Sequence, residues 1–311
     1  MGQLIYRYSQ DSIAKMKQHY AESLQSTPQG AIFRARTPHT VITAYKSGKV
    51  MFQGNRPEAE ADKWGADPLT DTKPGPKKRN RKGSLFTPPA TLFTSNHIGS
   101  DEAGTGDYFG PITTAAAFVK QEQLELLKEL GVQDSKNLSD TSIRKIAADI
   151  MHLDMPYSLL ILHNEKYNDL QKKGWTQGKM KAMLHHHAIN NVRKKIGTKQ
   201  LDGILIDQFC EPHVYKKHIA SENEELADNT FFMTKAESSS LAVAAGSIIA
   251  RASFLNEMDK LSDQVGFTLP KGASKKVDIT IAKIIKAKGK NSLTTCAKTH
   301  FANTKKASVY L

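Results

Sequence analysis

The chain of 311 residues is 39% hydrophobic and 24% charged, so it can bury a core and is not a disordered segment. Its two cysteines, Cys210 and Cys296, lie far apart without a CxxC neighbour, which argues against a disulfide framework or a thiolate metal site and predicts a reducing, cytoplasmic location. The net charge of +13 at pH 7 favours a polyanionic partner such as nucleic acid, although a basic surface that serves solubility would give the same balance.

Residues 1–68 predict a small α+β unit. A short strand around 4–8 precedes Ser9, which suits the N-cap of a helix over 10–25. Three segments rich in β-branched and aromatic residues then predict strands, and a second helix follows them; these elements are 31–37, 39–47, 49–54 and 56–65. Aromatic and basic residues lie together on these predicted strands, namely Tyr6, Tyr8, Arg34, Arg36, Tyr45 and Lys46. They suit contact with the sugars and phosphates of a nucleic acid, which we expect of Tyr6, Tyr45 and Lys46, although a half-buried sheet face would carry the same residue types.

Proline, glycine and charged residues dominate 69–92, which predicts a linker to a second domain over 93–311. In that domain strands are expected at 93–102, 113–120 and 202–209. Helices are expected at 121–130, 140–152, 176–195, 239–262 and 277–287. Alternating strands and helices predict an α/β sheet covered by helices. The longest apolar run, 241–250, is too short to cross a bilayer, so we expect no membrane segment.

Four acids stand at positions that can converge. Asp101 and Glu102 end the first strand of the second domain, Asp207 ends a buried apolar strand, and Glu237 precedes a long helix. Ligands of open α/β sheets bind beyond the carboxyl ends of strands, and clustered carboxylates repel unless hard cations such as Mg²⁺ lie between them. On a regular strand Asp101 and Glu102 point to opposite faces, so both serve one site only if the chain twists at the glycines or if one acts through a second metal.

Divalent ions held by carboxylates beside a basic surface predict two-metal hydrolysis of a phosphodiester. The glycine-rich stretch Gly104-Thr105-Gly106 follows the acids directly. Because glycine lets another backbone approach closely, the amide and carbonyl groups of this stretch can read a ribose 2′-hydroxyl. A contact of this kind would distinguish RNA from DNA.

A run of three histidines, 185–187, falls within the helix predicted over 176–195 and invites a zinc interpretation. Successive residues of a helix point about 100° apart, so three consecutive histidines cannot all bind one ion. We expect no zinc site made from all three.

The stretch DEAGTGDYFGP, 101–111, resembles the signature of bacterial ribonuclease HIII. In the related ribonuclease HII the position of Thr105 is an arginine, and the position of Glu237 is an aspartate. Further matches extend the resemblance over about 93–306, namely DSKNL (134–138), ILIDQF (204–209), KAESSSLAVAAGSIIAR (235–251), LPKGA (269–273) and AKTHF (297–301).

The resemblance implies an RNase H-like fold, preceded by a small domain resembling the TATA-box-binding protein. It implies endonucleolytic cleavage of the RNA strand of RNA/DNA hybrids, with Mg²⁺ or Mn²⁺ as cofactor and 3′-hydroxyl and 5′-phosphate products. The residues to which it assigns metal binding and catalysis are Asp101, Glu102, Asp207 and Glu237. Those expected to contact the substrate are Gly104, Thr105, Gly106 and Lys136, the last through a phosphate.

Two other functions stay open at this point. An enzyme of ribonuclease HII type would cut at a single ribonucleotide embedded in duplex DNA. A non-catalytic nucleic-acid-binding protein would use the N-terminal unit and the basic C-terminal segment 271–311 without metal-dependent turnover. We expect a monomer with no obligate protein partner.

Overall fold

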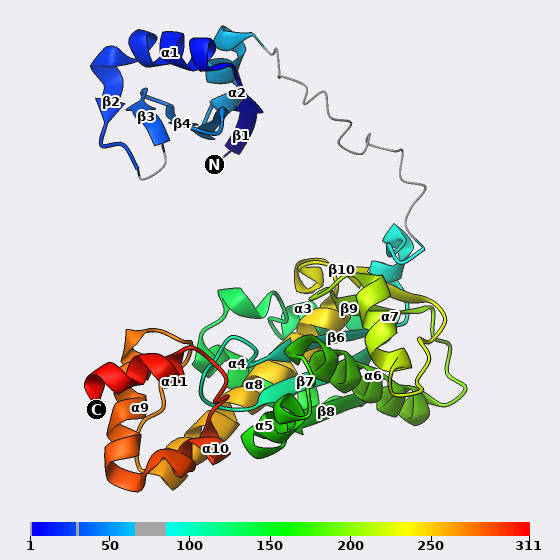
Figure 1. Cartoon of the computed structure of the whole chain (residues 1–311). Coiled ribbons are helices and arrows are strands. Elements are labelled where there is room, and N and C mark those ends of the chain that lie inside the picture. The colour runs from blue at the N-terminus through cyan, green and yellow to red at the C-terminus, as the bar shows by residue number, and fades with distance from the viewer. Residues whose placement is uncertain (1, 29–30, 66–84) are drawn as a thin grey trace. The chain divides into compact units, whose positions relative to one another are not determined.

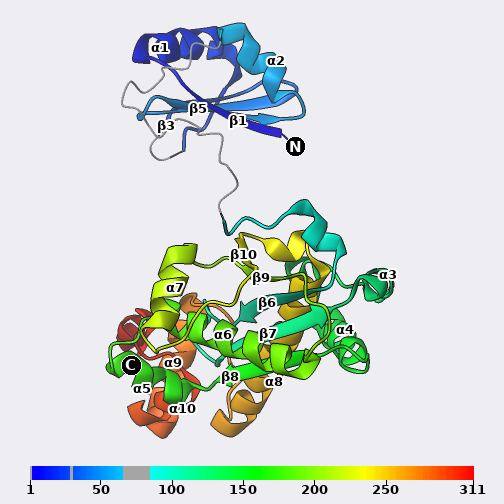
Figure 2. The ribbon, with the colours of Figure 1, turned by 90° about the vertical axis from the view of Figure 1, so that its right-hand side faces the viewer.

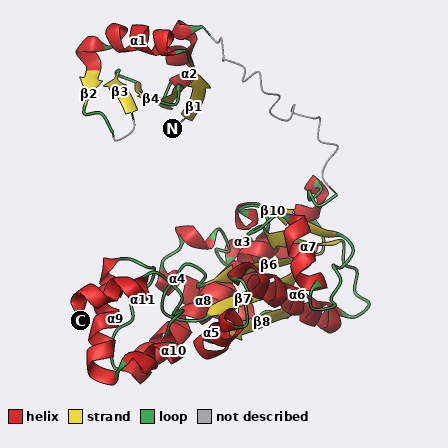
Figure 3. Cartoon of the chain, viewed as in Figure 1, coloured by secondary structure: helices red, strands yellow, loops and turns green. Residues whose placement is uncertain are grey.

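The computed structural model describes residues 2–28, 31–65 and 85–311. The chain divides into two compact units, Met1–Lys82 and Gly83–Leu311, and strands and helices occur in both (Figures 1 and 3). Most of the predicted linker, 69–84, lies outside the described residues. Its last residues pack on the second unit, because residues 90–94 form a short 3₁₀-helix whose Leu92 is buried against Leu205 and Val243.

The N-terminal unit is built on an antiparallel sheet of five strands in the order β1-β5-β4-β3-β2. Its elements are β1 (Gly2–Arg7), α1 (Gln10–His19), β2 (Leu24–Gln25), β3 (Ala31–Arg36), β4 (Thr40–Tyr45), β5 (Lys49–Gly54) and α2 (Pro57–Ala61). Ser9 caps α1 as predicted, because its hydroxyl accepts a hydrogen bond from Ser12 N at 3.1 Å. The predicted α+β fold of this unit is confirmed.

The two helices of the N-terminal unit lie on one face of its sheet (Figure 2). Ile13 and Met16 of α1 pack there on Phe33, Ile42 and Phe52 of the strands. Successive strand residues alternate between the faces, so the opposite face carries another set of side chains. That second face includes Arg34 and Arg36 of β3.

The second unit contains a mixed sheet of five strands in the order β10-β9-β6-β7-β8. The strands are β6 (His97–Ala103), β7 (Ile112–Val119), β8 (Tyr157–Leu162), β9 (Gly203–Asp207) and β10 (Thr230–Met233). β6, β9 and β10 run parallel, whereas β7 and β8 are antiparallel to their neighbours. The carboxyl ends of β6, β9 and β10 therefore meet at one edge of the sheet.

Helices cover both faces of this sheet (Figures 1 and 2). On one face α3 (Leu124–Glu129), α4 (Asp140–Met151) and α8 (Leu241–Val265) form an apolar core with β7. On the other face α6 (Gln177–Ile196) and α7 (Pro212–Ala220) pack on β6, β9 and β10. A Cβ on Gly99 would lie 2.1 Å from Val243 N, so glycine lets α8 lie directly on β6. The predicted α/β class is confirmed.

The remaining helices lie at the C-terminal end of the chain and beside β8. They are α5 (Asn164–Lys172), α9 (Lys275–Lys288), α10 (Leu293–Cys296) and α11 (Asn303–Lys306). α9 and α10 form a separate apolar core with Tyr108 and Phe109, which follow the glycine-rich stretch. Among the described helices, none combines the length and the apolar character that crossing a bilayer requires.

Candidate active site

Two of the predicted acids end neighbouring parallel strands. Ser100 of β6 is paired with Ile206 of β9, so Asp101 and Asp207 follow that pair at the same edge of the sheet. Asp101 is 6% exposed, and Asp207 is half-buried. The side chains of both acids are therefore directed by regular strands rather than by a mobile loop.

Glu237 joins them from the next strand. β10 runs parallel to β9, and Lys235 then turns the chain with a left-handed backbone, φ 57°. Ala236 N donates a hydrogen bond to Asp207 Oδ1 at 2.8 Å, which fixes the short 3₁₀-turn Ala236–Ser238 beside β9. Glu237 lies in this turn, just before α8, as predicted, and is 3% exposed.

Asp101, Asp207 and Glu237 form a group in which each residue offers one carboxylate oxygen, and these three oxygens lie within 4.8 Å of one another. Burial, followed by the charges of Glu102 and Asp207, raises the pKa of Asp101 well above its ordinary value. Burial and the charge of Glu237 likewise raise the pKa of Asp207 to about 6, against the hydrogen bond from Ala236 N. The negative charges of these carboxylates are therefore not fully balanced by nearby positive charge.

The group fits a divalent cation. Its donors are all carboxylate oxygens, which Mg²⁺ and Mn²⁺ prefer. Glu237 Oε2 is buried and accepts no hydrogen bond from the described part of the chain, so this oxygen is free to act as a ligand.

Among the described residues, Lys136 contacts this group. It lies in the 3₁₀-turn Ser135–Asn137, which is capped by Asp134 and held to α8 by a 2.9 Å contact between the Ser135 and Ser247 hydroxyls. Its Nζ donates to Glu237 Oε1. Burial alone would raise the pKa of Glu237, but the hydrogen bonds with Lys136, with Asp207 and with its own backbone, together with the charge of Lys136, outweigh burial and lower it. The Lys136 side chain remains 68% exposed, so it can also reach a ligand in solvent.

Glu102 does not join the group of three acids. It faces α6, where its oxygens contact Lys181 and His185, neither of which the sequence singled out as a partner of Glu102. Burial alone would raise the pKa of Glu102, but the hydrogen bond from His185 and the charges of His185 and Lys181 lower it to about 2. Helical spacing could have suggested this pair, because residues four apart share a face.

The glycine-rich stretch turns sharply after β6. Gly104 has φ +84°, and a Cβ there would lie 2.3 Å from Pro111 O, so the turn requires glycine. A Cβ on Gly106 would meet nothing within 4 Å, so the backbone at Gly106 is open to a ligand. Thr105 lies between them, and its carbonyl oxygen accepts from Gln177 Nε2 at 3.1 Å.

A buried lysine holds the end of the same stretch. Lys298 is fully buried, and its Nζ donates to the carbonyl oxygens of Asp107, at 2.9 Å, and of Gly110. Asn164 Nδ2 also donates to Gly110 O, at 2.9 Å. Burial lowers the pKa of Lys298 to about 7. The loop that follows the acids is thus fixed from the C-terminal part of the chain.

The substrate contacts expected in the N-terminal unit lie in different environments. Tyr6 faces the helix-covered side, with its ring centroid 6.4 Å from that of Phe52, so core packing accounts for it. Tyr45 ends β4 opposite Ala31, and Lys46 is exposed in the following turn. The sequence missed a cavity of about 440 Å³ on this unit, whose lining includes basic and polar residues: Arg34, Arg36, Thr37, His39 and Asn55.

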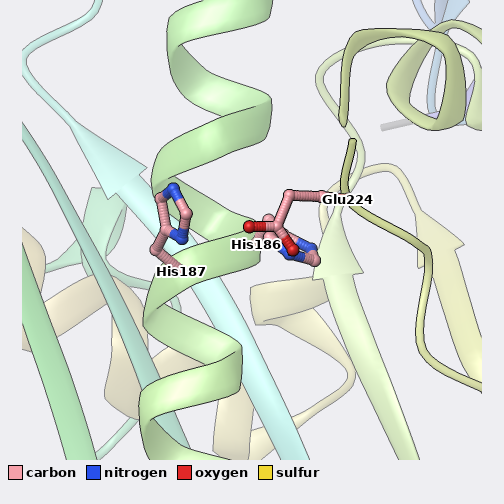
Figure 4. A group of neighbouring side chains, drawn as sticks. All are labelled: His186, His187 and Glu224. Carbon is pink, nitrogen blue, oxygen red and sulfur yellow. The ribbon is translucent and has the colours of Figure 1, made fainter. Parts of the chain in front are cut away.

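The three histidines do not converge. His185 contacts Glu102, whereas His186 Nε2 lies 3.0 Å from Glu224 Oε2 on the other side of α6. Figure 4 shows His186 and His187 on one turn of the helix, with Glu224 beside His186. Ligand atoms of His186, His187 and Glu224 lie within 4.8 Å of one another, a grouping that the sequence did not predict.

Comparison with known proteins agrees with this architecture. A family model described as Ribonuclease HII matches residues 98–304, and one described as a domain of unknown function (DUF3378) matches residues 3–77. Ribonuclease HIII of Oceanobacillus iheyensis is 58% identical over 311 residues, covering 100% of both chains. Ribonuclease HIII of Bacillus mycoides is 50% identical over 305 residues, covering 98% of this chain and 97% of the relative. A solved structure, Bst-RNase HIII in complex with Mn²⁺, matches with a TM-score of 0.69 and 40% identity over 99% of each chain.

A mixed sheet with clustered acids at one edge, together with the matched family model, defines a nuclease of the ribonuclease H class. At this identity and coverage, the chain belongs to the ribonuclease HIII family. The resemblance noted in the sequence and the predicted class of enzyme are thereby confirmed.

Proposed function

We propose that the chain is an endoribonuclease that hydrolyses the RNA strand of RNA/DNA hybrids and leaves 3′-hydroxyl and 5′-phosphate ends. The observation that carries the proposal is the convergence of Asp101, Asp207 and Glu237 at the sheet edge in a member of this family. The structure of Bst-RNase HIII with Mn²⁺ supports Mn²⁺ or Mg²⁺ as the cofactor. The enzyme acts as a monomer in the cytoplasm.

Each acid has a role in this proposal. Asp101, Asp207 and Glu237 would hold one ion, and Glu102, on the other face of β6, would join Asp101 in holding a second. Ions bound by these acids supply an activated water and stabilise the leaving oxygen of the phosphodiester. The residues themselves orient the site, because Asp101 and Asp207 are fixed by paired strands and Glu237 by the hydrogen bond between Ala236 and Asp207.

Residues beside the acids would bind the RNA strand. The open backbone at Gly104, Thr105 and Gly106 would contact the ribose and its 2′-hydroxyl. Lys136 would leave Glu237 when an ion takes its place and would then bind a phosphate, which its largely exposed side chain permits.

The N-terminal unit would also bind the hybrid. Its cavity presents two guanidinium groups, from Arg34 and Arg36, and the buried Arg34 Nε has no hydrogen-bond partner in the described part of the chain. Arginine suits phosphate because its planar group donates in a fixed fork. Tyr45 and Lys46 at the end of β4 would extend this contact.

An end-labelled RNA/DNA hybrid tests the proposal. Purified protein should cleave it with Mg²⁺ or Mn²⁺ and not with EDTA, and RNA termini should be 3′-hydroxyl and 5′-phosphate. Asp101→Asn should abolish cleavage and leave hybrid binding largely intact, because the lost carboxylate serves chemistry. Asp169→Asn, which changes an exposed acid of α5, is the matched control and should cleave normally. Normal cleavage by Asp101→Asn would show that the site is wrongly assigned.

A further inference from the structure

Glu102 differs from the other three acids in its surroundings. It follows Asp101 on β6, and successive side chains of a strand point to opposite faces. The Asp101 carboxyl interacts with Ser247 of α8, whereas the Glu102 carboxyl lies against α6. Without contacts to another element, the Glu102 side chain near the end of β6 would be free to rotate. The contacts on α6 prevent that.

Two side chains of α6 bind Glu102, one for each carboxylate oxygen. Lys181 Nζ donates to Oε1 at 2.8 Å, and His185 Nε2 lies 2.9 Å from Oε2. Because Lys181 and His185 are four residues apart, they lie one turn apart on the same face of the helix. The Glu102 carboxylate is therefore held at both oxygens, in a defined plane.

The two donors are themselves fixed. His185 is fully buried and Lys181 is 8% exposed. His185 Nδ1 lies 2.7 Å from Ser100 Oγ, so the ring turns its Nε2 toward the strand end. The ring of Phe209 stacks on His185 at 5.3 Å between centroids and lies 4.0 Å from Lys181 Nζ. Neither donor can leave without breaking these contacts.

A role in stability alone does not account for this arrangement. Pairing charges in a buried site seldom adds net stability, because the cost of removing them from water offsets their attraction. The same carboxylate adjoins a group of acids that would bind metal, and a preorganised ligand is what such a site needs.

We propose that Lys181 and His185 are positioning residues that hold the Glu102 carboxylate on the α6 side of β6, separate from the group of Asp101, Asp207 and Glu237. The inference rests on the proposed function. Lys181 and His185 keep the Glu102 carboxylate oriented for the second ion, while the other three acids serve the first. Without these contacts Glu102 would rotate, and the second position would lose its fixed ligand.

Two substitutions of His185 separate this role from packing. His185→Gln places an amide near the position of Nε2 and can still donate to Glu102. His185→Asn places its amide near Nδ1 and keeps only the contact with Ser100. We expect kcat on an RNA/DNA hybrid with Mn²⁺ to fall about tenfold further in His185→Asn than in His185→Gln, with KM for the hybrid within about twofold of wild type in both.

A second readout uses metal-free protein and does not depend on activity. Lys181→Met leaves the buried Glu102 carboxylate with one donor fewer, so the urea midpoint should fall. Adding Glu102→Gln removes the charge that Lys181 balances, so the double variant should recover most of that loss. Lys179→Met is the matched control. Lys179 lies on the same helix as Lys181 and pairs with Glu222, which follows α7, so its loss breaks a lysine–glutamate pair and should leave kcat unchanged.

The outcomes are distinct. Equal kcat values for His185→Asn and His185→Gln would overturn the positioning role, and so would urea midpoints that change additively in the Lys181 and Glu102 variants. If the wild-type protein cleaved no hybrid with either ion, the proposed function would fail. The metal-free double-mutant cycle would then still decide whether Lys181 acts through Glu102.

Discussion

Asp207→Asn should make the metal-free protein more stable at pH 7.5 while abolishing cleavage. Asp207 lies beside Glu237 in a partly buried site, and burial together with that charge raises its pKa from 3.8 to about 6. The substituted side chain keeps an oxygen that can accept from Ala236 N, so the turn that carries Glu237 is preserved. What the substitution removes is a negative charge that the folded state disfavours.

The magnitude follows from linkage between folding and protonation. A pKa raised from 3.8 to about 6 corresponds to about 3 kcal/mol against the ionised folded state. Because Asp207 is only half-buried, solvent screening reduces this to about 1.5 kcal/mol. The folded protein binds more protons than the unfolded protein between pH 3.8 and about 6, so wild-type stability falls as pH rises through that window. Asp207→Asn has no carboxyl group at this position, so its stability does not show this fall.

Urea unfolding of metal-free protein measures the effect. The free energy of unfolding of Asp207→Asn should exceed that of wild type by about 1.5 kcal/mol at pH 7.5, and the difference should vanish near pH 4. Asp169→Asn, which changes an exposed side chain of α5, should change stability by less than about 0.5 kcal/mol. Saturating Mn²⁺ should stabilise wild type by about 2.7 kcal/mol at one hundred times its Kd, and the variant by less. A variant that is less stable at pH 7.5, or a difference that persists at pH 4, would refute the reasoning.

Three further predictions concern the loop, the buried lysine and the N-terminal cavity. Gly104→Ala should destabilise the protein by about 2–4 kcal/mol, because residue 104 has a φ of +84° and a Cβ there would clash with its neighbours. Gly106→Ala, where a Cβ meets nothing, should change the free energy of unfolding by less than about 0.5 kcal/mol. Urea unfolding of both variants measures this difference, and equal effects would contradict the prediction. The free energy of unfolding of the wild-type protein should rise between about pH 7 and 10.5, because Lys298 releases its proton in the folded protein and keeps it in the unfolded protein. Lys298→Met should lack this rise, and a pH profile of the variant that parallels wild type would contradict the prediction. The double variant Arg34→Gln/Arg36→Gln should weaken binding to an uncleaved hybrid and reduce the salt dependence of log Kd by about two, whereas an unchanged salt slope would exclude these side chains as phosphate contacts.

The sequence predicted best those elements that local patterns determine. Alternating β-branched and aromatic residues located β3, β4 and β5, and Ser9 marked the start of α1. The end of α1 was placed too late, because the helix stops at His19 and Leu24–Gln25 pair with β3 instead. Strand pairing of this kind depends on a partner distant in sequence, which helical periodicity does not report.

Several elements of the second unit were not predicted at all. β8, α5, α7 and β10 are short, and their sequences lack a strong period. The omission of β10 matters for the site, because β10 brings the chain back parallel to β9 and so delivers Glu237 to Asp207. The convergence of these acids was predicted from strand ends, but the element that produces it was not.

The prediction for Glu102 shows where sequence reasoning about the site ended. Alternation along β6 would place Asp101 and Glu102 on opposite faces unless the chain twisted at the glycines, and it did not say which of these holds or what Glu102 would contact. The answer depends on which helix covers that face of the sheet, a matter of tertiary packing. His185 was considered only within a run of three histidines, and in the structure its role is tied to Glu102 rather than to its neighbours in that run.

The acids on the α6 side and on the α8 side of β6 are balanced by different charges, and this difference affects the order in which ions would bind. On the α6 side, Lys181 and His185 lower the pKa of Glu102 to about 2, so that carboxylate is ionised and paired before any ion binds. On the α8 side, Asp101 and Asp207 have raised pKa values. A cation that binds on the α8 side would therefore relieve more unfavourable charge than one that binds beside Glu102. We therefore expect the first ion to bind at the group of three acids, with Glu102 held in place for the second.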